Sequence, residues 1–519
     1  MKKTLGIVTF FTACSVAFAG TSKVAPDVPL SNPNAMINVI VQFKLPTNVA
    51  QFASLGQIQK SFNIINGIHM TVPASVVQFL AMNPLVSYIS PVRSLKGAVD
   101  ISTSTVDGPL VWSYGYDGTG VGVAVIDSGI TLKNDLNGAN GRTRVVYTQD
   151  WTGGNGSDAY GHGTHVAGII AGNGANSSGS GFSRTFKGMA PNVNLINLRV
   201  LDQNGVGNES DVISAIQQAI ALKNTYNIRV INLSLGRQVY ESYTLDPLCQ
   251  AVEAAYKAGI VVVVAAGNSG RDNSMGTKGY GTIAAPGNDP YVITVGATNA
   301  KNSASPADDS IATYSSKGPT LVDHIVKPDL VAPGNGVISL LASPTCTLAA
   351  NYPSTLIKDG VYETSGTLSA YSTDYYKLSG TSMATPVVSG GVALLLQKTP
   401  SLTPDQVKAR LMKTARKILP SYMSGTEIVT NAVYMNQADI FTVGAGYVDV
   451  FNALQSNDLV TLPAASPTVS RDSVTGKVQL IRNLAVIWGD STIWGDAVIW
   501  GSSIFKVSST GSPLSGAMP

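Results

Sequence analysis

Val121-Gly122-Val123-Ala124-Val125-Ile126-Asp127-Ser128-Gly129 opens with an apolar run and ends in an aspartate, a serine and a glycine. Similar short runs, rich in β-branched residues, follow at 195–200, 228–233, 260–265 and 292–295. None of them alternates between apolar and polar residues, a pattern typical of strands that are buried on both faces. The sequence therefore predicts a mostly parallel central sheet.

Segments of helical character separate these predicted strands. They cover residues 166–171, 210–226 and 248–258, and a further helix is expected from 403 to 417. The last helix begins with Thr403-Pro404-Asp405-Gln406, a capping box with proline at the first helical position. Strands that alternate with helices predict an α/β fold with helices on both faces of the sheet.

The composition narrows the classes of protein that fit. The chain has 519 residues, of which 44% are hydrophobic and only 13% charged, with 52 glycines and a formal net charge of +3. Soluble domains are about 25% charged on average. So many apolar residues and so little net charge exclude a disordered charged tail, and the shortage of charge excludes a long coiled coil. The lack of a basic excess argues against nucleic acid as a partner.

Asp127 stands at the carboxyl end of a predicted parallel strand, where open α/β sheets place their sites. The chain has four histidines, and two of them lie in the segment 161–168, Gly-His-Gly-Thr-His-Val-Ala-Gly. His162 and His165 are three residues apart with no acid between them, whereas helical zinc pairs are usually four apart and flank a glutamate. This spacing does not favour a metal site, and it leaves His162 as a candidate general base.

Ser382 lies in the segment 380–386, Gly-Thr-Ser-Met-Ala-Thr-Pro, directly before an apolar run. A serine at the N-terminus of a helix is close to backbone N–H groups that stabilise developing negative charge. A nucleophilic serine needs a base, and the base needs an acid that fixes its tautomer. Asp127, His162 and Ser382 supply one residue for each role, so the sequence predicts a catalytic triad.

The segments 125–129, 161–168 and 380–386, in this order, resemble the subtilisin family of serine endopeptidases, the subtilases. The resemblance covers about residues 105–457. It implies hydrolysis of peptide bonds in proteins or peptides through an acyl-enzyme, with no cofactor required for the chemistry. A catalytically silent surface-binding protein on the same fold is the alternative. An esterase of another α/β fold would carry a Gly-x-Ser-x-Gly turn, which is absent around Ser382.

The resemblance also implies roles for residues around the predicted triad. Asn268 matches the side chain that completes the oxyanion hole, and His165 matches a residue without a catalytic role. An extended substrate would lie as an added strand between two segments. The implied substrate-binding residues are Ser234, Leu235 and Gly236 on one side, Gly205, Val206 and Gly207 on the other, and Ala265, Ala266, Gly267 and Ala284 around the pocket for the residue before the scissile bond. Alanine at position 284 leaves space, which predicts a preference for bulky apolar or aromatic side chains.

The N-terminus has the pattern of a secretory signal peptide. Two lysines precede an apolar run at 5–18, and Ala17-Phe18-Ala19 offers a cleavage site. Residues 1–19 are therefore expected to be removed and the protein to be secreted. The run is shorter than the ~20 residues that span a bilayer, and no other stretch reaches that length, so no transmembrane anchor is expected.

Residues 20–100 are expected to form a separate small α+β unit with its core at 37–92. Strand-like segments at 37–43, 68–72 and 86–89 accompany a short helix at 73–80. This unit resembles the inhibitory propeptide of the family, which would assist folding, block the cleft and be removed autocatalytically within 93–107. A permanent N-terminal domain is the alternative. The catalytic domain is then expected at 101–457.

The sequence leaves three features open. The loop at 172–189 contains no Asp or Glu, so a structural calcium ion near Asp135, which resembles one family ligand, would need Asn173 or Asn176 and backbone carbonyls. Cys249 and Cys346 could form a disulfide or remain free thiols. Residues 458–519 are expected to form a linker and a repetitive tail without a firm role, in which Trp488, Trp494 and Trp500 recur every six residues.

Overall fold

The computed structural model describes residues 23–92, 94–97, 104–301, 303, 305–365, 369–427, 430–471 and 478–481, and two short strands, β23 (Phe505–Lys506) and β24 (Ser515–Gly516). The signal peptide predicted at 1–19 and the tryptophan repeats lie outside these residues. Among the residues described, no helix is long and apolar enough to cross a membrane.

The predicted apolar runs pair as the core of an eight-stranded sheet, in the order β14-β13-β12-β10-β6-β8-β7, with β15 paired to β13. All the pairings are parallel except that of β13 with β14. The strands are β6 (Gly122–Asp127), β7 (Val145–Asp150), β8 (Asn194–Arg199), β10 (Ile228–Leu233), β12 (Val261–Ala265), β13 (Ile293–Asn299), β14 (Ser310–Ile311) and β15 (Leu330–Pro333). The α/β prediction is confirmed.

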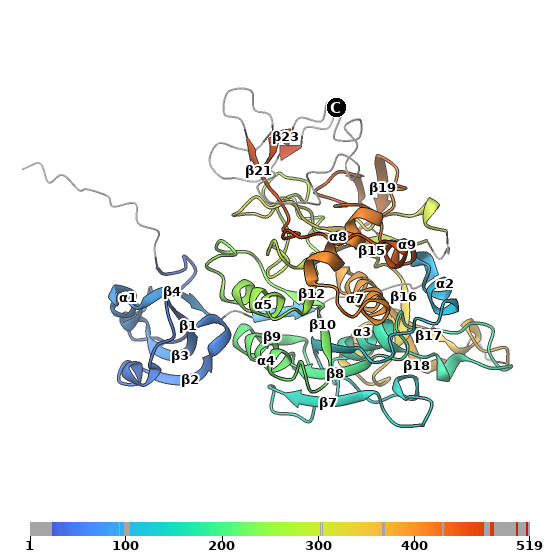
Figure 1. Ribbon diagram of the computed structural model, residues 1–519, viewed down its shortest axis with the longest axis horizontal. Coiled ribbons are helices and arrows are strands. Elements are labelled where there is room, and N and C mark those ends of the chain that lie inside the picture. The colour runs from blue at the N-terminus through green and yellow to red at the C-terminus, as the bar shows by residue number, and fades with distance from the viewer. Residues whose placement is uncertain are drawn as a thin grey trace, which may run out of the picture.

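Helices cover both faces of this sheet, as its doubly apolar strands require (Figure 1). One face packs against α3 (His162–Ala171) and α7 (Thr381–Lys398), and the other against α4 (Glu209–Ala221) and α5 (Pro247–Lys257). The capping box predicted at Thr403 opens α8 (Pro404–Thr414). Two short helices, α2 (Gly108–Ser113) and α9 (Val450–Gln455), pack against each other.

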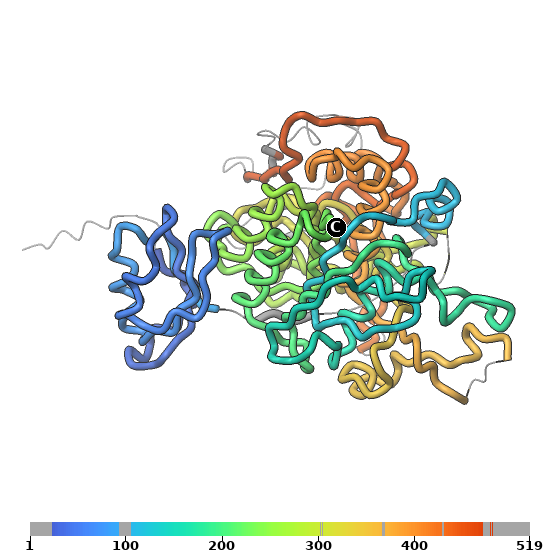
Figure 2. The backbone as a smooth tube through the Cα atoms, turned by 60° about the horizontal axis from the view of Figure 1, so that its bottom comes forward, coloured from blue at the N-terminus to red at the C-terminus, as the bar shows by residue number. Residues whose placement is uncertain are grey.

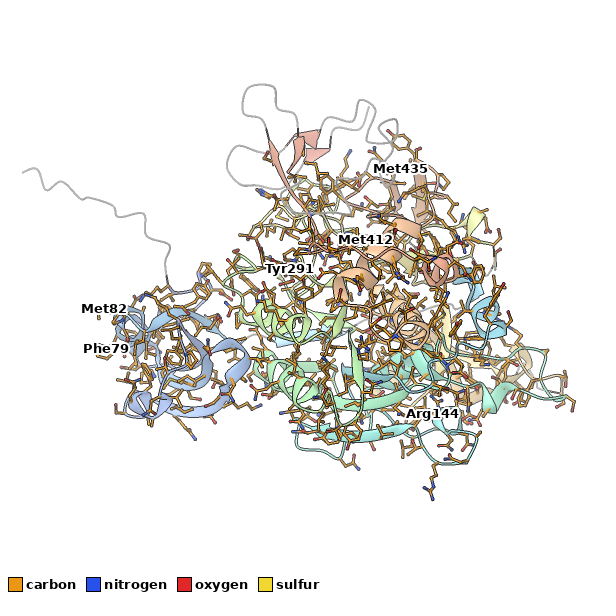
Figure 3. The ribbon with its side chains drawn as sticks, viewed as in Figure 1. Phe79, Met82, Arg144, Tyr291, Met412 and Met435 are labelled. Carbon is orange, nitrogen blue, oxygen red and sulfur yellow. The ribbon has the colours of Figure 1, made fainter. Side chains whose placement is uncertain are left out.

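The N-terminal unit is a four-stranded antiparallel sheet with one helix, α1 (Ala74–Met82). Its strands, in the order β2-β3-β1-β4, are β1 (Met36–Phe43), β2 (Gln57–Phe62), β3 (Gly67–Pro73) and β4 (Val86–Pro91). Strand β2 was not predicted, because its only large apolar residues are Ile58 and Phe62. Phe79 and Met82 are exposed on the side of the unit that faces away from the α/β domain (Figure 3).

This unit packs against the outer helices α4 and α5 of the α/β domain, as both views of the backbone show (Figures 1 and 2). Ile40, Phe62 and Ile65 of the unit belong to the same apolar cluster as the residues of these helices. The Gln42 amide donates a hydrogen bond of 2.7 Å to the Leu245 carbonyl oxygen. From this unit the chain continues into β5 (Ser94–Gly97), which pairs with the α/β domain.

The segment between β15 and α7, called the insertion below, forms a second small sheet that was not predicted from the sequence. Its strands are β16 (Val337–Leu340), β17 (Leu356–Lys358) and β18 (Tyr371–Leu378), with the short helix α6 (Thr347–Asn351) between the first two. β16 packs against α3, so the insertion lies beside the helix that begins with His162.

The C-terminal segment also departs from expectation. A hairpin of β19 (Tyr422–Thr426) and β20 (Val433–Gln437) precedes α9, and a second one of β21 (Thr468–Arg471) and β22 (Val478–Ile481) follows it. The sequence placed a boundary at 457, yet Ala464 and Val469 pack in a cluster with α8. Ser466 hydrogen-bonds to two buried charges, the Asp329 carboxylate and the Lys408 ammonium. The folded domain therefore continues past the expected boundary.

Candidate active site

Asp127 and His162 meet in the interior of the domain. Asp127 is the last residue of β6 and His162 is the first of α3. The Asp127 Oδ1 atom lies 2.7 Å from His162 Nδ1, and both side chains are fully buried. A carboxylate at this distance accepts the Nδ1 proton, so the other ring nitrogen of a neutral His162 is left as a proton acceptor.

A second buried carboxylate, Asp158, holds this pair in place. Its Oδ1 accepts hydrogen bonds from Ser128 Oγ at 2.8 Å and from the Gly161 N–H at 2.7 Å, and its Oδ2 accepts one from the Thr164 N–H at 2.8 Å. Ser128 Oγ in turn accepts from the Gly163 N–H at 2.9 Å. Burial raises the pKa of Asp158. The network ties the end of β6 to the first turn of α3.

Sequence reasoning missed Asp158, although a signal was present. An acidic side chain just before a helix commonly accepts hydrogen bonds from the free N–H groups of its first turn. The close approach of the two segments also explains Gly163. A Cβ atom added there would lie 2.2 Å from the Gly129 carbonyl oxygen, so only glycine fits.

Ser382 and Asn268 are brought together at the start of α7. Ser382 is the second residue of this helix, and its carbonyl oxygen accepts a hydrogen bond of 2.7 Å from Ser234 Oγ. The Asn268 Oδ1 atom accepts from the Thr381 N–H at 2.9 Å and from the Thr381 hydroxyl at 3.2 Å. Thr381 therefore fixes the oxygen end of the amide, which leaves its NH₂ end as a donor. Sequence reasoning did not single out Thr381.

A pocket of about 300 Å³ opens beside these residues. Of the residues expected in the site, it is lined by Ser382, Asn268, Leu235, Gly236, Ala265, Gly267 and Ala284. Two others lie behind its surface. Ala266 is fully buried, and its backbone bonds to Val295 and Ala284, while Ser234 is buried with its hydroxyl on Ser382.

The two segments expected to flank a substrate already have a strand between them. β5 pairs antiparallel with β9 (Val206–Asn208) on one side and with β11 (Leu235–Gly236) on the other. In this register Leu95 lies opposite Gly207, and Gly97 lies opposite Leu235. Gly205 precedes β9 with a φ of +72°, and a Cβ atom added there would lie 2.4 Å from the Tyr160 ring.

The surroundings of His165, Cys249 and Cys346 favour a structural role for these three residues. His165 is fully buried with its Nε2 atom 3.2 Å from the Val337 carbonyl oxygen, and burial lowers its pKa to about 3. It therefore stays neutral at physiological pH. Cys249 and Cys346 are both buried free thiols, and burial raises the pKa of each.

Asp135 was the one residue expected to mark a calcium site. Its carboxylate is fully buried, and Oδ2 accepts a hydrogen bond of 2.6 Å from the Tyr375 hydroxyl, while Oδ1 accepts one of 2.8 Å from the Asn176 N–H. The Asn173 amide donates to the Asn137 carbonyl oxygen. Calcium needs six to eight oxygens that point at the ion. Because both oxygens of Asp135 already bind protein donors, these residues do not fit a calcium ion as they are arranged. In the described part of the chain, no group of three His, Cys, Asp or Glu residues could hold a metal.

Comparison with known proteins identifies the family of this chain. The model of the subtilase family matches residues 118–446. The serine protease AprX of Bacillus subtilis (strain 168) is 38% identical over 384 residues, which cover 71% of this chain and 78% of that protein. Subtilisin E of the same organism is 34% identical over 378 residues, covering 72% of this chain and 82% of that protein. An alkaline protease of Alkalihalobacillus alcalophilus is 30% identical over 445 residues, covering 83% and 98%. The chain therefore belongs to the subtilase family and is a subtilisin-like serine protease.

Proposed function

We propose that the chain is a secreted endopeptidase in which Asp127, His162 and Ser382 form the catalytic triad. The observation that carries this proposal is the 2.7 Å contact of Asp127 with His162, together with the position of Ser382 and Asn268 in one pocket. Ser382 Oγ attacks the substrate carbonyl carbon while His162 Nε2 takes its proton. Asp127 stabilises the imidazolium that results.

The same residues complete the reaction. The Ser382 N–H and the Asn268 NH₂ group donate hydrogen bonds to the oxyanion, since Thr381 holds the other end of that amide. The C–N bond then breaks, and His162 returns its proton to the leaving amine. Water attacks the acyl-enzyme by the same route, which releases the carboxyl product and restores Ser382.

The groove between β9 and β11 supports an extended protein substrate. A peptide that occupies it would pair through its backbone with both strands, as β5 does. Such main-chain hydrogen bonds give affinity without reading side chains. We therefore propose that unfolded segments and exposed loops of proteins are the substrates.

We further propose that the enzyme is made as a zymogen and exported. The N-terminal unit packs on α4 and α5, with the Lys60 ammonium paired to Asp211 and the Asn63 N–H bonded to the Gln217 side chain at 3.0 Å. Its continuation, β5, fills the substrate groove, so the unit excludes other substrates until it is removed. This arrangement supports an inhibitory propeptide that the enzyme itself cuts.

The register of β5 predicts where that cut falls. Gly97, the last residue of β5, lies opposite Leu235, and Ser234 directly before Leu235 binds the Ser382 carbonyl oxygen through its hydroxyl. We expect cleavage between Ala98 and Val99. N-terminal sequencing of the mature protein should then begin Val-Asp-Ile. A mature protein that begins at or before Gly97 would contradict this register.

The central experiment compares the full chain with Ser382→Ala, and uses Ser401→Ala, an exposed serine, as the matched control. Casein hydrolysis and N-terminal trimming should both vanish in Ser382→Ala, with turnover reduced by a factor of order 10⁶, as for subtilisin itself. The Ser401→Ala control should behave as the wild type. Digestion of casein by Ser382→Ala at the wild-type rate would exclude the proposed triad, and a wild-type chain that never digests casein would favour the silent binding protein.

A further inference from the structure

The pocket beside Ser382 carries two ionisable side chains in an otherwise uncharged wall. They are Arg237 and Asp272, and neither featured in the expectations from sequence. The rest of the wall includes apolar groups that suit an aliphatic or aromatic side chain, contributed by Leu235, Ile283, Ala284, Met275 and Leu321. The balance between the two charges decides which substrate side chains the pocket favours.

Arg237 has its positive charge neutralised within the protein. Its Nη2 atom donates to Glu209 Oε1 at 2.5 Å and to Asp246 Oδ2 at 2.8 Å, and its Nη1 atom donates to the Gln238 carbonyl oxygen at 3.0 Å. The side chain is only 3% exposed. Two carboxylates therefore offset this cation, and it adds no positive charge to the pocket.

Asp272 is in the opposite situation, since it is exposed and forms no ion pair with any cation among the residues that the structure describes. Its Oδ1 accepts a hydrogen bond of 2.8 Å from the Ser274 N–H, and its pKa is lowered by hydrogen bonds from Ser274. The carboxylate is therefore ionised at neutral pH. The adjacent Arg271 is directed elsewhere, because it pairs with Glu427 and donates to Thr313 Oγ1 at 2.8 Å.

We propose that Asp272 lets this pocket accept lysine and arginine, in addition to apolar side chains, at the residue before the scissile bond. The aliphatic stem of such a side chain contacts the apolar wall, and its cationic end meets the Asp272 carboxylate. The inference rests on the proposed endopeptidase function, and it extends the preference for bulky apolar residues that Ala284 predicts. Asp272 is a specificity-determining residue, and it takes no part in bond cleavage.

Two peptides test the proposal, identical except for lysine or norleucine before the scissile bond. Norleucine has the same four-carbon stem as lysine but no charge. We expect the ratio of kcat/KM for lysine over norleucine to fall about two- to fivefold in Asp272→Asn, the range of an exposed ion pair. In the wild type the same ratio should fall at about 1 M salt, because salt then screens exposed charges that are more than roughly 3 Å apart. Asp308→Asn, an exposed aspartate outside the pocket, is the matched control and should keep the wild-type ratio.

A charge reversal keeps the result unambiguous. Asp272→Lys should disfavour the lysine peptide further and gain activity on a glutamate peptide, because the sign of the pocket's charge is inverted. A lysine-to-norleucine ratio that is the same in wild type, Asp272→Asn and Asp272→Lys would overturn the proposal while leaving the endopeptidase function intact. Failure of the wild type to cleave either peptide, with Ser382→Ala behaving alike, would instead contradict the proposed function.

Discussion

Two buried aspartates lie near opposite ends of α3, and they are bound in different ways. Asp158, near the first turn, accepts hydrogen bonds from Ser128, Gly161 and Thr164, which lie in the segments 125–129 and 161–168. Asp135, near the last turn, is bound by Tyr375 from the insertion, which lies 240 residues further along the chain. Burial raises the pKa of both carboxyl groups.

The difference suggests that the two ends of α3 serve different purposes, one turnover and the other stability. At its first turn, under the proposed function, the carboxylates position the groups that react, so errors there should appear in turnover. At its last turn the Asp135 carboxylate fastens loops, because it accepts hydrogen bonds from the Tyr375 hydroxyl and from the Asn176 N–H. Errors there should appear in stability. The predictions below test this separation.

The largest effect is expected at Asp127. Asp127→Asn replaces the acceptor of the His162 Nδ1 proton by a group that favours the wrong tautomer, so kcat should fall by about 10⁴. The melting temperature should change little, since asparagine has the same shape. Measurement of kcat together with Tm tests this, with Asp308→Asn as control. A drop in Tm large enough to account for the lost activity would contradict a catalytic role.

A smaller loss is expected at Asp158. In Asp158→Asn one end of the side chain becomes a donor and faces backbone N–H groups, so Ser128 and the first turn of α3 shift. Displacement of His162 by about 1 Å would lower kcat about 10²-fold. KM should change much less than kcat. Equal changes in both, or a rise in KM alone, would show that Asp158 does not position His162.

At the other end of α3, Tyr375→Phe should affect stability and not turnover. The variant leaves Asp135 Oδ2 without its 2.6 Å hydrogen bond, which should lower the free energy of unfolding by about 1–3 kcal/mol. Unfolding is best measured in a Ser382→Ala background, where self-digestion does not act, and kcat in the active enzyme. Tyr352→Phe, an exposed tyrosine, is the control. A large loss of kcat in Tyr375→Phe would contradict the assignment of turnover to one end of α3 and stability to the other.

The smallest effect is expected from chelation. Because both Asp135 oxygens bind protein donors, EDTA should leave Tm unchanged in the Ser382→Ala background. A fall in Tm that calcium reverses, and that disappears in Asp135→Asn, would show instead that this carboxylate binds calcium.

Much of this molecule could be predicted from its sequence because the determining signals are local. The run from 121 to 126 is apolar at every position, so it had to be a strand with both faces covered, and β6 confirms this. Such patterns also delimit the elements at whose ends the motif residues lie. Asp127 ends β6, and His162 and Ser382 lie at the starts of α3 and α7. The antiparallel N-terminal unit was predicted in part, since the mostly polar strand β2 has no apolar alternation to reveal it.

The rest depends on contacts between distant segments. Nothing near Tyr375 in the sequence indicates that its hydroxyl reaches Asp135, because neither residue lies in a periodic pattern. The same holds for Asp272, which becomes part of the pocket only through the course of a long loop after Asn268. The free state of Cys249 and Cys346 was left open for the same reason.

The position of Ser466 has a consequence for the order in which the protein can be made. Asp329 and Lys408 are buried, and each hydrogen-bonds to this serine, which is far along the chain. During synthesis from the N-terminus these two charges lack that partner until residue 466 has emerged. The N-terminal unit has all its strands within the first 91 residues and can close its own core long before. The N-terminal unit, whose continuation β5 lies in the groove, can therefore fold before the α/β domain that forms the groove.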